Sequence, residues 1–125
     1  LTENPAGRRR IVRVEDDPEL REALRLFLDK KYEVVGAASG GRLLEMLDSY
    51  EPILVILDVN LPGKDGFELC RSLREQAEYR ELPIIMITTE SGEADKRMGM
   101  EAGVTTYLSK PISPQRLLYE IEKLL

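Results

Sequence analysis

The sequence predicts an α/β fold with a doubly wound, five-stranded parallel sheet that carries helices on both faces. Two observations lead to this prediction. From residue 11 onward, short apolar runs alternate with segments whose apolar residues recur at helical spacing, and the connections between them are short. The middle run, residues 53–57, consists of five consecutive aliphatic residues, which is typical of a strand buried on both faces of a parallel sheet.

Five strand-helix units follow one another along the chain. The strands are expected at residues 11–14, 32–35, 53–57, 84–87 and 106–108. The helices are expected at residues 18–30, through 43–47 and 67–73, weakly from about 93 to 102, and at 114–125. Pro18 suits a first helical turn, whereas Gly99 costs the weak fourth helix about 1 kcal/mol.

Each helix is predicted from apolar residues that share one face at helical spacing. These residues are Leu20, Ala23, Leu24, Phe27 and Leu28 in the first helix, Leu43, Leu44 and Leu47 in the second, Phe67, Cys70 and Leu73 in the third, and Leu117, Leu118, Ile121 and Leu125 in the last. The fourth helix lacks such a face. We expect it to be mobile, with Met98 facing outward toward a partner.

The first ten residues differ from the rest of the chain. Residues 1–10 carry a triple-arginine run and no periodicity, so they are expected to form a flexible leader or linker, and residues 11–125 one domain. The net charge of −5 argues against nucleic-acid binding by this domain, because phosphate backbones require a concentrated positive surface. Cys70 is the one cysteine, and no apolar stretch approaches the roughly 20 residues of a membrane span. A cytoplasmic location without membrane contact is therefore expected.

Acidic residues follow the first and third expected strands. Glu15 and Asp16 come directly after the first strand, and Asp58 follows the apolar run 53–57. In a doubly wound sheet the carboxyl ends of these strands are neighbours, so three carboxylates should share one pocket. At an effective dielectric of about 20, like charges about 4 Å apart repel by about 4 kcal/mol, so the cluster must hold a proton or recruit a cation. With no histidine in the chain, oxygen ligands favour Mg²⁺, or Mn²⁺, over zinc.

Two further side chains indicate phosphoryl chemistry. Thr88 ends the fourth strand, and Lys110 follows the fifth. Magnesium accepts phosphate oxygens, while an ammonium group and a hydroxyl can neutralise phosphoryl oxygens on the side away from the metal. Asp58 is then the nucleophile, since aspartate forms acyl phosphates in other enzymes. Because the chain has no histidine, the phosphoryl group must come from an external donor.

These motifs, in this order and at these spacings, resemble the response-regulator receiver domains of bacterial two-component signalling. The resemblance runs from about residue 10 to residue 125. It consists of the acidic pair Glu15 and Asp16, Asp58 with the Pro-Gly-Lys-Asp-Gly loop behind it, Thr88, and Lys110 followed by Pro111. It implies a flavodoxin-like sheet with the strand order 2-1-3-4-5 and a cis peptide bond before Pro111.

The resemblance also implies how the domain works. Asp58 would accept a phosphoryl group from a phosphohistidine of a histidine kinase, with Mg²⁺ held by Asp16, Asp58 and the backbone carbonyl of Asn60, and with Glu15 acting mainly through water. Thr88 would then swing toward the phosphoryl group, and Tyr107 would rotate inward behind it. That movement would repack the surface of the fourth helix, the fifth strand and the fifth helix, which is the expected output surface.

The expected partners are a histidine kinase or phosphotransfer protein, an effector domain or protein at the output surface, and a second copy in a phosphorylation-dependent homodimer. Turnover of external substrates is not expected. Phosphatases of the haloacid dehalogenase type carry a second aspartate two residues after the nucleophile, and this chain has Asn60 there. The cognate kinase, the output domain, the phosphoryl lifetime and the oligomeric state do not follow from the sequence.

Three interpretations stay open. The chain could be a degenerate receiver that acts as a constitutive protein-binding or dimerisation module. Asp17 is interpreted as an exposed residue at the start of the first helix, favoured by the helix dipole, with the role of a third metal ligand as the alternative. Arg13 occupies a strand position where an aliphatic residue is normal; our hypothesis is that its stem packs while its guanidinium finds an acidic neighbour.

Overall fold

In the computed structural model, strands and α-helices alternate as predicted over the residues that the structure describes, which are 7–15, 17–37, 40–58, 66–89 and 93–125. The strands are β1 (Arg9–Val14), β2 (Tyr32–Ala37), β3 (Leu54–Asp58), β4 (Ile84–Thr88) and β5 (Thr106–Ser109). The helices are α1 (Pro18–Leu28), α2 (Leu43–Tyr50), α3 (Gly66–Glu75), α4 (Glu93–Ala102) and α5 (Pro114–Leu124). Short 3-10 helices precede α2 (Gly40–Arg42) and follow α3 (Ala77–Tyr79).

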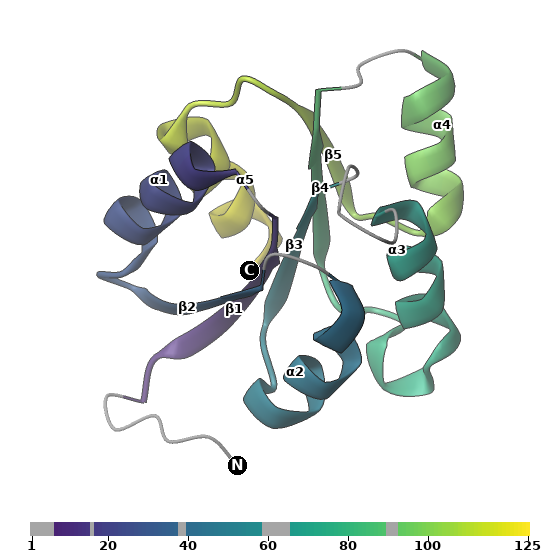
Figure 1. Cartoon of the computed structure of the whole chain (residues 1–125), viewed down its shortest axis with the longest axis horizontal. Coiled ribbons are helices and arrows are strands. Elements are labelled where there is room, and N and C mark those ends of the chain that lie inside the picture. Colours follow the sequence, from purple (N-terminus) through teal and green to yellow (C-terminus); the bar gives the residue numbers. More distant parts are fainter. Residues whose placement is uncertain (1–6, 16, 38–39, 59–65, 90–92) are drawn as a thin grey trace.

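The strands form one parallel sheet in the order β2-β1-β3-β4-β5, which confirms the doubly wound, flavodoxin-like prediction. Helices α1 and α5 cover one face of the sheet, and α2, α3 and α4 cover the other (Figure 1). Because all the strands are parallel, β1, β3, β4 and β5 end on the same side of the molecule. Within the described residues, no helix is long and apolar enough to cross a bilayer.

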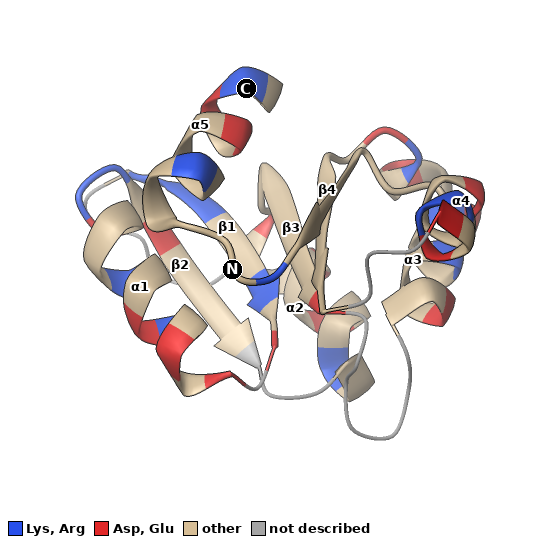
Figure 2. Ribbon diagram, turned by 90° about the horizontal axis from the view of Figure 1, so that it is seen from above, with Lys and Arg blue, Asp and Glu red and all other residues tan. Residues whose placement is uncertain are grey.

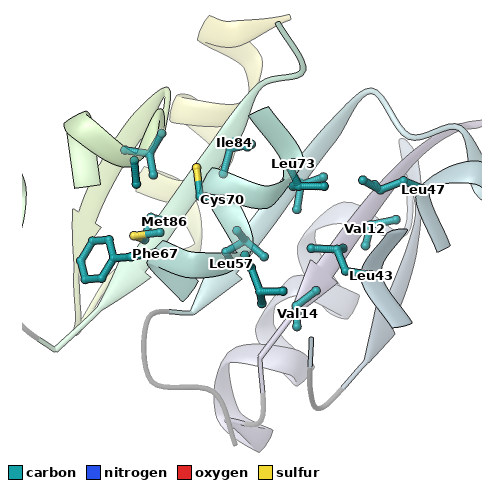
Figure 3. Close-up of a cluster of buried hydrophobic side chains, with 14 residues drawn as sticks. Val12, Val14, Leu43, Leu47, Leu57, Phe67, Cys70, Leu73, Ile84 and Met86 are labelled. Atoms are coloured by element: carbon teal, nitrogen blue, oxygen red, sulfur yellow. The ribbon is translucent and has the colours of Figure 1, made fainter. Parts of the chain in front are cut away.

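Two apolar layers hold the helices against the sheet. Along β3 and β4 successive side chains enter opposite layers, because side chains alternate across a strand. Val55, Leu57 and Met86 pack with α2 and α3, as Figure 3 shows for the last two, whereas Ile56 and Ile85 pack with α1 and α5. Both faces are covered, so the strands read as continuous apolar runs in the sequence.

The strand β1 begins two residues before the predicted start. Arg9 and Arg10 pair with Tyr32 and Glu33 on β2, so the end of the arginine run belongs to the sheet. Arg10 Nε donates to Glu33 Oε2 at 2.8 Å, and its guanidinium lies 5.4 Å from the centre of the Tyr50 ring. These charges stand out on β1 and β2 against the uncharged β4 (Figure 2). Arg9 and Arg10 are therefore part of the sheet, and the prediction that they belong to a flexible leader was wrong.

At the opposite end of the sheet from the ends of β3 and β5, Arg74 ties three chain segments together. Its Nε donates to the carbonyl of Gly103 at 2.8 Å, and its Nη1 donates to the carbonyls of Tyr79 at 2.8 Å and Leu82 at 2.7 Å. Gly103 has a φ of 101°, a conformation that favours glycine. Arg74 therefore fixes both the α3 to β4 connection and the loop that leads from α4 into β5.

Replacing Arg74 with methionine is expected to lower the free energy of unfolding by about 2–3 kcal/mol, because three partly buried carbonyls lose a charged donor. Urea unfolding followed by circular dichroism measures the loss. Arg71, exposed one turn earlier on α3, gives the matched control Arg71→Met, which should change stability by less than about 0.5 kcal/mol. Equal losses in the two variants would contradict the role of Arg74.

Candidate functional site

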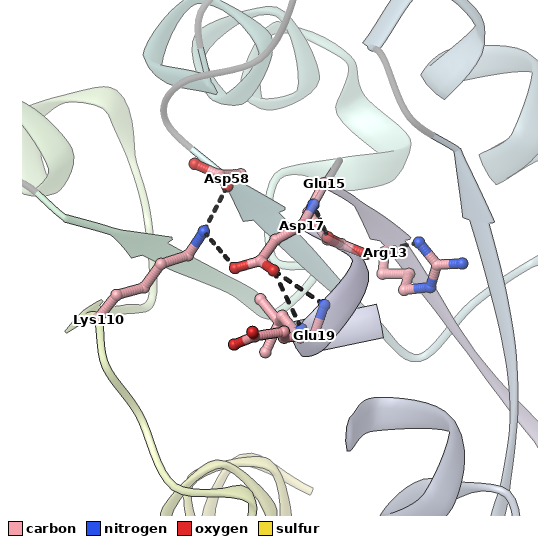
Figure 4. Close-up of polar contacts among 7 residues, drawn as sticks. Arg13, Glu15, Asp17, Glu19, Asp58 and Lys110 are labelled. Atoms are coloured by element: carbon pink, nitrogen blue, oxygen red, sulfur yellow. Dashed lines mark hydrogen bonds and ion pairs between the residues drawn. The ribbon is translucent and has the colours of Figure 1, made fainter. Parts of the chain in front are cut away.

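The site forms where β3 and β5 end. Asp58 is the last residue of β3 and is 4% exposed, and Lys110 follows β5. The ammonium Nζ of Lys110 lies 2.9 Å from Asp58 Oδ2, although the two residues are 52 positions apart (Figure 4). β4 lies between β3 and β5, so the long lysine stem reaches across the end of β4 to the carboxylate. A buried carboxylate is thereby matched with a cation in the pocket where the sequence predicts both.

Thr88 ends β4 between these two residues. It is fully buried and pairs with Ser109 of β5 in the sheet register, while the residue before it, Ile87, pairs with Asp58 of β3. The backbone carbonyl of Thr88 accepts a 2.6 Å hydrogen bond from the backbone N–H of Lys110, which fixes the turn after β5. The Lys110-Pro111 peptide bond is cis, as the family resemblance implies. The fold thus gathers Asp58, Thr88 and Lys110 at one edge of the sheet.

Both carboxylate oxygens of Glu15 are engaged by neighbours on its own side of the pocket. Oε1 accepts from Arg13 Nη1 at 2.7 Å, and Oε2 accepts from the backbone N–H of Asp17 at 2.6 Å. Figure 4 shows the Glu15 carboxylate pointing toward Arg13. Burial raises the pKa of Glu15, although the Asp17 N–H and the Arg13 charge oppose that shift. Both oxygens of Glu15 are thus already occupied by contacts within the protein.

Arg13 resolves the oddity noted in the sequence. Its guanidinium pairs with Glu15 and lies over Gly36, its partner in the β1-β2 register. A Cβ built on Gly36 would overlap Arg13 Cζ, so a larger residue there would require the guanidinium to shift. Burial lowers the pKa of Arg13, and the Glu15 charge opposes that shift. The hypothesis of an acidic neighbour is confirmed, and the neighbour is Glu15.

Asp17 lies at the start of α1, as interpreted from the sequence, but it is half-buried rather than exposed and has a second contact that the sequence did not reveal. Its Oδ1 accepts from the backbone N–H groups of Glu19 at 3.0 Å and Leu20 at 3.4 Å, which makes it the N-cap. Its Oδ2 lies 3.5 Å from Lys110 Nζ. Burial acts to raise the pKa of Asp17, but the two N–H groups and Lys110 outweigh it, and the net pKa is lowered.

The pKa of Lys110 reflects the same balance. Burial acts to lower it, but the contacts with Asp58 and Asp17 outweigh burial and raise the pKa above its ordinary value. Lys110 therefore stays protonated at neutral pH, and its stabilising contribution is lost only as the pH rises through the alkaline range of the lysine pKa. The ammonium group is a fixed positive charge beside Asp58.

Asp16 and Asn60, the other residues predicted to hold a metal, lie outside the described residues. Among the residues that are described, no three His, Cys, Asp or Glu side chains are close enough to form a metal site by themselves. The donors that are placed here, Asp58 and Glu15, offer carboxylate oxygens, while Cys70 is buried in the core. This set fits a hard divalent cation better than zinc.

A groove leads away from Lys110 between α1 and the start of α5. Its apolar lining comes from Leu20 and Ala23 of α1, Ile112 of the loop before α5 and Pro114 at the start of α5. Its polar lining is Asp17, Glu19, Thr89 and Lys110, with Pro111 beside Lys110.

Replacing Arg13 with methionine is expected to lower the free energy of unfolding by about 1–3 kcal/mol near neutral pH, because the buried Glu15 carboxylate loses its charged donor. The loss should shrink at acid pH. The pKa of Glu15 is already raised, so the folded protein holds this proton more tightly than the unfolded chain, and stability falls as pH rises through the carboxylate range. Without Arg13 that pKa rises further and the fall becomes larger.

Urea unfolding at acid and neutral pH measures this difference. The control Arg25→Met removes an arginine whose pair with Glu22 is exposed, and it should leave the urea midpoint nearly unchanged at either pH. A gain in stability for Arg13→Met, or a loss that does not depend on pH, would contradict the argument.

Comparison with known proteins gives a consistent result. Residues 11–122 match the response regulator receiver domain family. The transcriptional regulatory protein GltR of Pseudomonas aeruginosa PAO1 is 43% identical over 121 residues, which are 96% of this chain and 50% of GltR. The chain therefore spans about half the length of this curated relative.

Two solved structures share the fold. A response regulator from Chloroflexus aurantiacus J-10-fl has a TM-score of 0.86 and 38% sequence identity, and the match covers 94% of this chain and 97% of that chain. The Mn²⁺-bound form of the response regulator Rcp1 has a TM-score of 0.77 and 25% identity, with 93% and 91% of the two chains covered.

Proposed function

The chain belongs to the response regulator receiver domain family, and from this premise we propose that it is a phosphorylation-activated switch whose phosphoacceptor is Asp58. The observation that carries the proposal is the 2.9 Å contact between Asp58 and Lys110 at the carboxyl edge of the sheet. The donor is a phosphohistidine of a histidine kinase or phosphotransfer protein. The domain promotes its own phosphorylation and dephosphorylation but turns over no other substrate.

In the transfer step an Asp58 oxygen attacks the phosphorus atom of the donor. A P–O bond forms, the P–N bond of the phosphohistidine breaks, and its electron pair stays on the imidazole nitrogen. Lys110 neutralises the phosphoryl oxygens, and the Thr88 hydroxyl donates to one of them. Thr88 ends the strand next to that of Asp58, and the Lys110 ammonium already lies 2.9 Å from Asp58, so the cation needs little reorganisation.

A divalent cation completes this site in our proposal. Asp16, Asp58 and the backbone carbonyl of Asn60 would hold Mg²⁺, or Mn²⁺, with Glu15 acting through water. When bound, the cation supplies positive charge to the phosphoryl oxygens. Support comes from the oxygen-only donor set and from the Mn²⁺-bound form of Rcp1, which has the same fold. Engagement of Glu15 by Arg13 and the Asp17 N–H fits its indirect role.

The output is a change at the surface of α4, β5 and α5. Thr88 moves toward the phosphoryl group, and Tyr107 of β5 rotates inward behind it. To move the switch from about 1:99 to about 99:1, phosphorylation must favour the active state by about 5.5 kcal/mol, which a few charge-assisted hydrogen bonds can supply. We propose that an effector domain or protein binds this surface and that phosphorylation can also favour a homodimer.

The wider setting of the switch is also part of the proposal. The match to GltR, a transcriptional regulator, favours an effector that acts on transcription. The net charge of −5 argues that any nucleic-acid contact belongs to the effector rather than to this domain. We assign the protein to the bacterial cytoplasm, where histidine kinases present their phosphohistidine. The competing function, a degenerate receiver that binds partners constitutively, would need no phosphoryl group.

Incubation with a small-molecule phosphodonor and Mg²⁺ is expected to add one phosphoryl group, seen by intact mass. Asp58→Asn, and chelation of the metal, should each abolish the adduct, since the first removes the nucleophile and the second the charge that neutralises the phosphoryl oxygens. Asp29→Asn, an exposed aspartate at the end of α1, should retain it. Absence of an adduct on the wild-type chain would contradict the proposed switch and favour a degenerate receiver that binds partners constitutively.

Replacing Lys110 with methionine is expected to slow this phosphorylation by about 10²-fold, the usual cost of losing one preorganised group at a developing charge. The rate is followed by intact mass over time. Lys30→Met removes an exposed lysine beyond α1 and should leave the rate unchanged. A wild-type rate in Lys110→Met would remove the ammonium group from the mechanism.

A further inference from the structure

The ring of Tyr107 lies against the backbone of α4 at Gly99. A Cβ built on Gly99 would fall 2.7 Å from Tyr107 Cδ2 and 3.2 Å from Cε2, closer than side chains normally approach. The same Cβ would lie 3.5 Å from Phe67 Cε1 on α3. The missing side chain of Gly99 is therefore the space that the tyrosine ring fills.

The backbone of Tyr107 is fixed within the sheet, and its side chain packs against the apolar layer beneath α3 and α4. It pairs with Met86 of β4 in the parallel register, it is half-buried, and it packs against the apolar layer that contains Phe67 and Val104. Three elements, α3, α4 and β5, thus meet around one ring. Movement of the ring away from this place would leave a gap above Gly99, and gaps of this kind destabilise a packed interior.

The rest of α4 offers little else to fix its position. Of its residues, Gly99 and Ala102 are buried, and neither has a large side chain. Met98 is 45% exposed and Met100 is 58% exposed, so Met98 faces outward as expected. The attachment of α4 therefore depends on close approach of its backbone to the neighbouring side chains, with the Tyr107 ring in the central place.

We propose that Gly99 is the positioning residue through which the place of the Tyr107 ring is transmitted to α4. The ring and the helix share one volume, so they cannot move independently: where the ring leaves, α4 loses its support, and where α4 carries a larger residue, the ring cannot take this place. This inference rests on the proposed function, since it assigns how the switch tyrosine acts on the output surface.

Helix propensity predicts the direction in which a substitution at Gly99 should change stability. Alanine is a better helix former than glycine, so Gly99→Ala would stabilise α4 if nothing opposed it. Contact with Tyr107 predicts the reverse. The variant Gly41→Ala is the matched control, because a Cβ at Gly41 meets nothing within 4 Å.

A double-mutant cycle measures the coupling. The urea midpoints of the wild type, Gly99→Ala, Tyr107→Ala and the double variant are compared. Gly99→Ala is expected to lower the midpoint in the wild-type background and to raise it in the Tyr107→Ala background. Gly41→Ala should have the same effect in both. A rise of equal size for Gly99→Ala in both backgrounds would overturn the proposal.

Hydrogen exchange after phosphorylation tests the transmission itself. In the wild type, loading Asp58 is expected to change the exchange rates of α4. In Gly99→Ala the phosphoryl adduct should still form, and the change in α4 should be reduced at least twofold. An unaltered α4 response would overturn the proposal. If the wild type forms no adduct, the proposed function fails and the transmission with it, while the urea cycle still reports on the contact between Gly99 and Tyr107.

Discussion

The ion pair between Asp58 and Lys110 is the interaction on which the candidate site depends. A carboxylate that is 4% exposed is costly to hold in its charged form unless a cation lies beside it, and Lys110 supplies that cation from 52 residues away. The order of the strands makes this possible, because β3 and β5 end at the same edge with only β4 between them. The apolar layers on both faces of the sheet hold these three strand ends in register.

Two other acidic side chains described at these strand ends, Glu15 and Asp17, each have hydrogen-bond donors or a cation beside them. Glu15 has Arg13 and a backbone N–H, and Asp17 has two N–H groups of α1 and a share of Lys110. Negative charge is thus compensated locally before any metal ion is considered. Lys110, which compensates both Asp58 and Asp17, also lines the open groove between α1 and the start of α5.

Prediction from sequence succeeded where a single strand end decides the position of a residue. Asp58, Thr88 and Lys110 each follow an apolar run, and parallel strands bring such ends together. It could not give the direction of the Glu15 carboxylate, because that depends on an arginine reaching sideways over a glycine of β2. It also could not show that Asp17 touches Lys110, a contact between residues 93 positions apart, or that Arg10 belongs to the sheet. The fit of Tyr107 on Gly99 depends on how α4 crosses β5, which no local pattern encodes.

The seat of Arg13 on Gly36 has a consequence for how this sequence can change through evolution. The guanidinium lies where a side chain at position 36 would start, so a mutation of the glycine alone requires the end of the arginine side chain to shift and disturbs its contact with Glu15. A mutation of the arginine alone removes the charged hydrogen-bond donor of Glu15. Substitutions at positions 13 and 36 are therefore expected to be coupled, so that the tolerance of one position depends on the residue at the other.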